Sequence, residues 1–252
     1  MILEWIILFS ILGSIGAISA AALFVLLTER VQKSLVSMLI SFATGTLLTA
    51  ALFGLIPEAI ESAGGEPHNV MLFVLGGILF FFFLEKIIIW RNCTDEDCDV
   101  HAAAGPIILI GDAFHNFIDG IVIAASFLTS FSVGISVSFA IIAHEVPQET
   151  GDFGILLHGG FSKKKAFFLN TLSSITTIPA AIVSYFVLGE ISFIVPYALA
   201  ISAASFLYIA LSDLTPELHK KWGLKHSLQQ LILILLGVTV MILTMSVMGH
   251  NH

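Results

Sequence analysis

The chain has 252 residues, of which 57% are apolar and only 11% are charged, and its formal net charge at pH 7 is −8. Soluble domains usually carry about 25% charged residues, so this composition excludes an ordinary water-soluble domain. The negative charge also argues against a nucleic-acid partner, which would favour a basic surface. A lipid bilayer is therefore the expected partner of most of the chain.

Eight apolar segments are long enough to cross the hydrocarbon core, which takes about 20 helical residues. They predict an all-α, multi-pass membrane protein, because lipid forces backbone polar groups to pair within each helix. The connections are short, so residues 1–252 are expected to form a single eight-helix domain. The first segment is too long for a signal peptide and lacks a preceding basic residue, so we expect it to be retained. The expected spans are residues 2–27, 34–60, 70–90, 103–128, 132–157, 165–188, 191–214 and 227–248.

Every Lys and Arg lies in or beside the connections that follow the first, third, fifth and seventh spans. The positive-inside rule places these four connections in the cytoplasm. Both termini are then expected outside the cytoplasm, in a protein of the cell (inner) membrane. The ten basic residues are Arg30, Lys33, Lys86, Arg91, Lys163, Lys164, Lys165, Lys220, Lys221 and Lys225.

The connection between the third and fourth spans reads RNCTDEDCDVH and holds both cysteines, Cys93 and Cys98. A disulfide is disfavoured there because the cytoplasm is reducing. Two interpretations stay open, a weak metal-binding loop or a solvated acidic loop. The further residues that the first would use are Asp95, Asp97, Asp99 and His101.

Buried polarity is concentrated in two neighbouring spans. Polar residues of the fourth span recur at i, i+3, i+4 and i+7, which is one face of a helix, and those of the fifth follow a similar pattern. The connection TSF between them is short, so the two helices are expected to be antiparallel neighbours with facing polar sides. These residues are Asp112, His115, Asn116 and Asp119, then His144, Glu145, Gln148, Glu149 and Asp152.

The carboxylates of these spans need a positive partner. Each one costs about 2.5–3.5 kcal/mol at the bilayer centre, and every Lys and Arg is already placed at the cytoplasmic edge. Protons or metal cations are therefore the expected counter-charge. Imidazole, carboxylate and amide donors suit Zn²⁺, Fe²⁺ or Mn²⁺ better than Cu⁺, and a Ca²⁺ site would not need two histidines. The alternative is a polar seam that is satisfied within the protein.

Two segments echo one another. Residues 51–59 read ALFGLIPEA and residues 210–218 read ALSDLTPEL. The predicted orientation runs the first outward and the second inward, which is the pattern of an inverted repeat, although chance similarity of apolar segments is the alternative. In transporters such a repeat places the substrate site near the midplane, at the repeat interface.

The segments HNFIDG, HEVPQETGDF, FATGTLLTAALFGLIPEA and FLYIALSDLTPEL resemble the signature helices of the ZIP (zinc–iron permease-like) metal transporters. The resemblance covers nearly the whole chain. It implies a ZIP-like bundle of eight helices with both ends extracytoplasmic. It also implies a transporter rather than an enzyme, which takes up divalent metal, chiefly zinc, into the cytosol by alternating access and often as a homodimer. The long His-rich loop of many eukaryotic members is absent, which suggests a compact, prokaryote-like member.

The resemblance further implies metal ligands, with Asp119 and Glu145 placed to bridge two adjacent metals. Three departures leave one versus two metals open: Gln148 and Gly54 stand where one branch has His, and the sixth span has no carboxylate. The implied ligands are His115, Asn116, Asp119, His144, Glu145, Gln148 and Glu149. The candidate residues of a transport pathway are Asp112, Asp152, Asn170, Asp213 and Glu58.

Three other functions remain in competition with zinc uptake. A broad-range carrier would also take iron, manganese or cadmium, and an exporter with similar ligands would move metal outward. An intramembrane zinc hydrolase would fit buried His and Asp, but the HExxH motif is absent and no separate nucleophile is evident.

Overall fold

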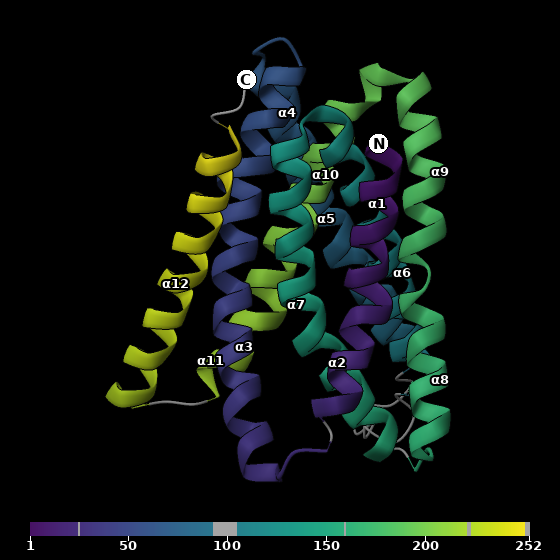
Figure 1. Ribbon diagram of the computed structural model, residues 1–252, viewed down its shortest axis with the longest axis vertical. Coiled ribbons are helices and arrows are strands. Elements are labelled where there is room, and N and C mark those ends of the chain that lie inside the picture. The colour runs from purple at the N-terminus through teal and green to yellow at the C-terminus, as the bar shows by residue number, and fades with distance from the viewer. Residues whose placement is uncertain (25, 93–104, 159, 221–222, 250–252) are drawn as a thin grey trace.

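The structure is a computed structural model that describes residues 1–24, 26–92, 105–158, 160–220 and 223–249. Within these ranges the regular elements are all helices, which confirms the predicted all-α class (Figure 1). Cys93, Cys98 and His101 lie outside them, so both interpretations of that loop remain predictions. The elements are α1 (Ile2–Ile11), η1 (Leu12–Gly16), α2 (Ala17–Phe24), α3 (Glu29–Thr49), η2 (Ala50–Leu55), α4 (Ile56–Ser62), α5 (Pro67–Asn92), α6 (Gly105–Thr129), α7 (Phe131–His158), α8 (Lys163–Ser174), α9 (Thr177–Glu190), η3 (Ser192–Ile194), α10 (Val195–Tyr208), η4 (Ile209–Leu214), α11 (Thr215–His219) and α12 (Leu224–Gly249).

Seven stretches of the described chain are long and apolar enough to cross a membrane as helices. The helix outside this set is α7, which is 28 residues long and runs through Pro147. Its two histidines and three carboxylates lower its hydropathy, although its length matches that of its neighbours. Together the seven stretches and α7 match the eight predicted spans. The seven are Ile2–Phe24, Ser34–Ser62, Pro67–Ile87, Leu109–Thr129, Lys163–Glu190, Val195–His219 and Leu224–Val247.

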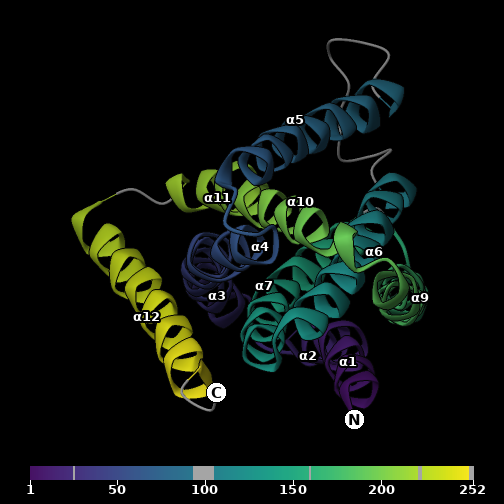
Figure 2. The same cartoon turned by 90° about the horizontal axis from the view of Figure 1, so that it is seen from above.

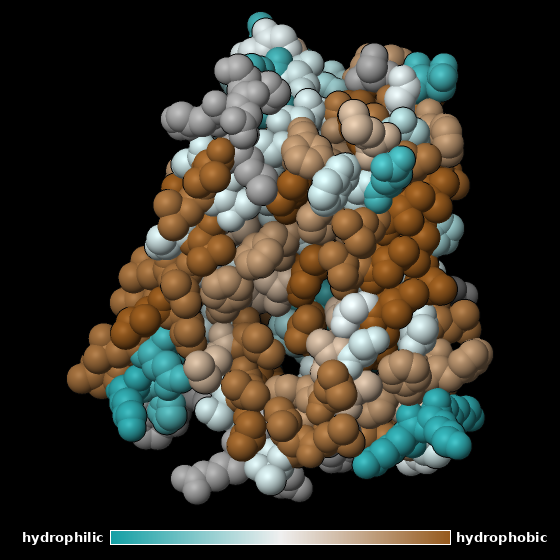
Figure 3. All heavy atoms as spheres, viewed as in Figure 1, coloured by the Kyte–Doolittle hydropathy of each residue, from teal (hydrophilic) through white to brown (hydrophobic). Residues whose placement is uncertain are grey.

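Basic residues mark one end of the bundle. The beginning of α1 and the last turn of α12 lie at the upper end in Figure 1, and we call this the upper end. The beginnings of α3, α8 and α12 lie at the opposite, lower end. Figure 3 shows hydrophilic side chains at the lower corners, over the beginnings of α8 and α12, with a hydrophobic band above them. The lysines of residues 163–165 begin α8 and therefore belong to the lower end.

The two segments that echo one another in sequence share a local structure. Each joins a helix to a six-residue π-helix and then to an α-helix with proline in its first turn, Pro57 in α4 and Pro216 in α11. Proline is favoured at this position because it has no N–H to leave unpaired. The α3–η2–α4 segment runs to the upper end and α10–η4–α11 runs to the lower end (Figure 1), as an inverted repeat requires.

The outer helices of the two halves pack in corresponding ways. Figure 2 shows α12 beside α3 on one side of the bundle and α5 beside α10 on another. A Cβ added at Gly77 of α5 would lie 2.6 Å from the Cβ of Ala204 in α10. A Cβ added at Gly237 of α12 would lie 2.4 Å from the carbonyl oxygen of Phe42 in α3. Glycine therefore permits the close helix approach in both pairs, as small residues commonly do in membranes.

Helices α6 and α7 form the central hairpin, with one residue, Ser130, between them. Helix α6 also packs closely on α9, because a Cβ at Gly120 would lie 2.3 Å from the carbonyl oxygen of Thr177. Helices α6 and α7 are therefore antiparallel neighbours inside the bundle, as their short connection predicted.

Candidate metal centre

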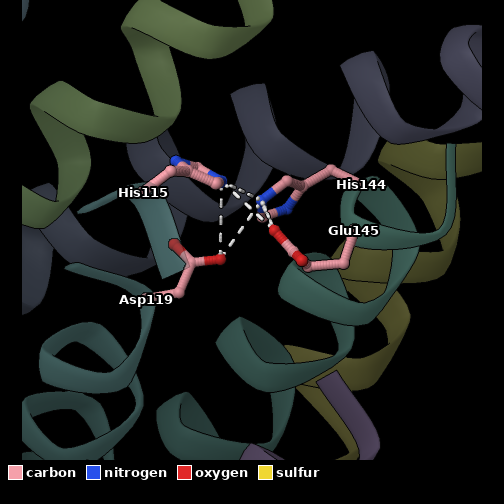
Figure 4. Close-up of side chains that lie close together, drawn as sticks. All are labelled: His115, Asp119, His144 and Glu145. Atoms are coloured by element: carbon pink, nitrogen blue, oxygen red, sulfur yellow. Dashed lines mark hydrogen bonds and ion pairs between the residues drawn. The ribbon is translucent and has the colours of Figure 1, made fainter. Parts of the chain in front are cut away.

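Four side chains converge between α6 and α7 (Figure 4). His115 and Asp119 stand one turn apart on α6, while His144 and Glu145 are adjacent on α7. One ligand atom from each lies within 4.8 Å of the others. We call these four residues the metal centre.

The distances in the metal centre suit one divalent ion. The two Nε2 atoms of His115 and His144 lie 3.1 Å apart. His144 Nε2 lies 3.2 Å from Asp119 Oδ2, and His115 Nε2 lies 3.2 Å from Glu145 Oε1. The remaining imidazole–carboxylate distances are 3.5 and 3.7 Å. Tetrahedral zinc, with bonds of about 2.0–2.1 Å, would hold its ligand atoms about 3.4 Å apart. The five distances are therefore close to those between the ligands of a zinc-sized ion, and all four ligand atoms lie within 4.8 Å of one another.

The metal centre is buried and rich in negative charge. Asp119, His144 and Glu145 are at most 1% exposed. Among the described residues, the carboxylate oxygens of Asp119 and Glu145 have no hydrogen-bond donor, and their ion-pair partners are the two imidazoles. Neutral imidazoles leave two negative charges uncompensated, and buried charges are normally paired or bound to metal. A dication would supply the missing charge.

His144 is oriented by a backbone contact. Its Nδ1 lies 3.0 Å from the carbonyl oxygen of Ala140, one turn earlier in α7. Since a carbonyl only accepts, Nδ1 carries the proton and the lone pair of Nε2 is left available to a cation between His144, Asp119 and His115. This arrangement, with the outer nitrogen held by a carbonyl, is usual for histidines that ligate metals.

Asn116 is turned away from the metal centre. Its Nδ2 donates to the backbone oxygen of Asp112 at 3.2 Å and to Asp112 Oδ1 at 3.0 Å. Its Oδ1 accepts a hydrogen bond of 2.8 Å from the hydroxyl of Thr177. The amide thereby ties α6 to α9. A ligand role for Asn116 stays a prediction.

Gln148 and Glu149 also bond to residues outside the metal centre. Gln148 Nε2 donates to Asp112 Oδ1 at 3.2 Å. Glu149 is fully buried and accepts from the hydroxyl of Ser174, while its backbone oxygen accepts from Asn170 Nδ2 at 3.2 Å. Glu149 therefore faces α8, and the predicted ligand roles of both residues remain predictions.

The predicted pathway residues fall into two groups. Asp112 and Asp152 lie on the lower side of the metal centre, one turn before His115 and two turns after His144. Asp112 is buried, whereas Asp152 is partly exposed. Asp213 is exposed in η4, and Glu58 is partly buried in α4. Neither of these two belongs to the metal centre.

Sequence reasoning did not single out two hydroxyl residues that bond to predicted ligands. Ser174 and Thr177, at the junction of α8 and α9, hold Glu149 and Asn116 respectively. The available signal was their spacing from Asn170, since residues at i, i+4 and i+7 share one helix face.

Comparison with known proteins gives one family. A profile described as "ZIP Zinc transporter" matches residues 91–245. "Zinc transporter ZIP13" of Pongo abelii is 34% identical over 219 residues, which cover 81% of this chain and 65% of that protein. "Zinc transporter ZIP13 homolog" of Drosophila melanogaster is 29% identical over 322 residues, with coverages of 96% and 90%. "Zinc transporter ZIP13" of Homo sapiens is 30% identical over 259 residues, with coverages of 81% and 69%.

The chain spans just under two thirds of the length of the Pongo abelii protein. All three relatives come from animals, and the prokaryote-like character suggested by the short loops stays a prediction. The share of the chain that the profile matches is well over half.

Proposed function

The chain belongs to the ZIP family of zinc transporters, and from this membership we propose that it carries divalent metal cations, chiefly zinc, across a membrane. The observation that supports this best is the metal centre, where two imidazoles and two buried carboxylates converge. No Lys or Arg of the described chain pairs with those carboxylates, so the cation itself is the counter-charge that makes the site stable.

We propose transport rather than catalysis because the side chains of the metal centre are suited to bind a metal ion. The four side chains fit an ion, and the ligands around it are all from α6 and α7. A hydrolase would need, in addition, a place for a scissile bond beside the metal. Purified protein in liposomes that moves zinc inward and cleaves neither lipid nor peptide would support transport. Zinc-dependent cleavage without uptake would contradict it.

The direction that we propose is uptake into the cytosol. Asp112, Gln148 and Asp152 continue from the metal centre toward the lower end, where the lysines of α8 lie. If the positive-inside rule holds, this end is cytosolic and the three residues form the route of release. In vesicles of known orientation, zinc accumulation only from the upper-end side would support uptake, and the opposite asymmetry would favour an exporter.

Sidedness can be tested separately from transport. In a variant without Cys93 and Cys98, a Lys164→Cys substitution should react with an impermeant thiol reagent only from inside the cell. A tag at either terminus should be accessible only from outside. The opposite labelling pattern would overturn the orientation and, with it, the import direction and the placement in the cell membrane.

The choice among metals is also a proposal. The relatives are described as zinc transporters, and mixed imidazole and carboxylate ligands also suit Fe²⁺ and Mn²⁺. Zinc, iron, manganese and cadmium uptake should be measured side by side. The size of the purified protein in detergent would test the homodimer that the family resemblance implies.

A further inference from the structure

A second group of buried polar side chains lies on the lower side of the metal centre, where α8 packs against both α6 and α7. Helix α6 contributes Asp112, α7 contributes Glu149 and α8 contributes Asn170. Asp112 precedes His115 by three residues, and Glu149 follows Glu145 by four. Each carboxylate therefore stands about one helical turn, or about 5.4 Å, from the ligand on its own helix. We call Asp112, Glu149 and Asn170 the oxygen cluster.

Contacts across the three helices bring the oxygen cluster together. Asn170 Nδ2 donates to the backbone oxygen of Glu149 at 3.2 Å, and the hydroxyl of Ser174 donates to Glu149 Oε1. Ser173, the next residue of α8, lies beside Asp112. The carboxylates of Asp112 and Glu149 are also close enough for their charges to interact. One face of α8, with polar residues at i, i+3 and i+4, therefore reaches both carboxylates.

Each member of the oxygen cluster has one oxygen atom without a partner. Asp112 Oδ1 accepts from Gln148 Nε2 at 3.2 Å, but Asp112 Oδ2 has no hydrogen-bond partner among the described residues. The same holds for Glu149 Oε2 and Asn170 Oδ1. All three residues are at most 4% exposed. Buried polar atoms are normally satisfied, so three unpaired oxygens on adjoining helices point to a bound partner.

The charge of the oxygen cluster indicates what this partner is. Asp112 and Glu149 supply two carboxylates, and among the described residues no Lys or Arg forms an ion pair with either. Water would pair the free oxygens and leave the charge uncompensated, whereas a divalent cation would do both. Asp152, about one turn after Glu149 and partly exposed, connects the oxygen cluster with the lower end of the bundle.

We propose that the oxygen cluster is a second cation site, separate from the metal centre, which takes a hard divalent cation of the Mg²⁺ or Mn²⁺ class. Its free donors are all oxygens, without the imidazoles that the metal centre offers to zinc. Mg²⁺ typically binds one or two carboxylates and keeps several waters, which suits two carboxylates and one amide oxygen. The site binds its cation whether or not the chain transports zinc, so the inference goes beyond the transport function proposed above.

The test measures Mn²⁺ binding to the purified protein through the EPR signal of free Mn²⁺, which is lost on binding. The metal centre is first disabled with Asp119→Ala and Glu145→Ala. This double variant should still bind one Mn²⁺ per chain, and Mg²⁺ should displace it. Binding is measured at equilibrium and without a membrane gradient, so a failure of the transport function would leave this result unchanged.

Glu149→Gln, added to the double variant, tests the oxygen cluster itself. Glutamine keeps the size of the side chain and an oxygen that accepts from Ser174, but it removes the charge. The Mn²⁺ affinity should therefore fall about tenfold or more, and Asp112→Asn should have the same effect. The matched control is Glu66→Gln, which removes an exposed carboxylate and should leave the affinity unchanged.

Two results would overturn the oxygen cluster as a cation site. One is a double variant that folds and binds no Mn²⁺. The other is a Mn²⁺ affinity that stays within about twofold after Glu149→Gln, because the ion would then lie elsewhere, as on the acidic connection that contains Asp95 and Asp97.

The zinc-loaded chain keeps the inference testable if the double variant does not fold. The unmodified protein, with an equimolar amount of zinc, should bind Mn²⁺ in addition to the zinc. Glu149→Gln should weaken that binding about tenfold, and Glu66→Gln should not change it. Zinc-loaded protein that binds no Mn²⁺, or that binds it equally well after Glu149→Gln, would contradict the proposal.

Discussion

The α6–α7 hairpin is polar on the lower side of the metal centre and apolar on the upper side. Below the centre, Asp112 accepts from both Asn116 and Gln148. Among the described residues, Asp112 Oδ2, Glu149 Oε2 and Asn170 Oδ1 have no hydrogen-bond partner on this side. Above it, the residues are valine, isoleucine and phenylalanine around hydroxyls without partners. The side chain of His115 is 15% exposed, whereas that of His144 is 0% exposed. The same helix pair therefore carries polar side chains on the lower side of the metal centre and apolar side chains on the upper side.

The upper side is also packed more tightly. Trp5 and Phe131 meet edge to face at 5.5 Å, and Phe127 sits over Gly134, where a Cβ would lie 2.4 Å from its ring. On the lower side of the same helix, a Cβ added at Gly151 would meet nothing within 4 Å. The apolar upper side is therefore the more tightly packed one, and the polar lower side is the less tightly packed one.

The largest loss of zinc uptake should come from substitutions in the metal centre, which separates the polar lower side from the apolar upper side. Asp119→Ala and Glu145→Ala each remove a ligand and one negative charge, so the ion loses much of its binding free energy. We expect zinc uptake to fall about 100-fold or more, while the protein still inserts because no Lys or Arg loses a partner.

Uptake in proteoliposomes, with protein levels checked by immunoblot, measures this. The control is Glu190→Ala, since Glu190 is exposed at the end of α9. Near-normal transport by Asp119→Ala or Glu145→Ala would mean that the metal centre does not carry the cargo.

A pair of glycine variants tests the packing contrast directly. Gly134→Ala would force the buried Phe127 ring away, and such overpacking usually costs about 1–3 kcal/mol. Gly151→Ala on the same helix should be neutral or stabilising by about 0.5–1 kcal/mol, because alanine suits a helix better than glycine. Thermal unfolding in detergent should therefore shift in opposite directions. Equal melting temperatures for the two variants would remove the contrast.

The smallest effect on uptake is expected at Gln148, just below the metal centre. Gln148→His replaces an amide that bonds to Asp112 with an imidazole one turn from His144. We expect zinc to bind severalfold more tightly and uptake to favour zinc over manganese more strongly. Because tighter ground-state binding does not speed transport, the apparent KM should fall while the maximal rate stays flat or drops.

Gln148→Leu is the matched control, because it loses the bond to Asp112 without adding a ligand. Zinc and manganese uptake should be measured side by side in both variants. If the zinc-to-manganese ratio is the same for His and Leu at this position, residue 148 does not reach the ion.

Much of this arrangement could be predicted from sequence. Helical spacing placed His115 and Asp119 on one face, and the short connection set α7 against it. Spacing could not say which way an amide turns. Asn116 is next to His115 in the chain and Gln148 lies one turn after His144, yet both amides donate to Asp112. An amide carries donors and an acceptor, and the choice depends on partners such as Thr177 that come from another helix.

The fold, too, could be predicted from the sequence only in part. The echo between residues 51–59 and 210–218 predicted an inverted repeat, and the shared proline-led turn and opposite directions agree with it. The close contacts at Gly77 and Gly237 were not predicted, because hydropathy does not reveal which glycine meets a neighbouring backbone. The π-helical turns were not predicted either, since their composition is that of any apolar helix.

Those wide turns, η2 and η4, affect how sequences of this kind should be aligned. A π-helical turn accommodates one more residue than an α-helical turn, and each residue of an α-helix turns the chain by about 100°. Deleting Leu52 would convert η2 into an ordinary turn and leave Pro57 and Glu58 on nearly the same face relative to α3, because the wide turn had absorbed the extra residue. A single-residue gap between homologues belongs within residues 50–55 or 209–214, where the helix can take up the change without displacing a whole face.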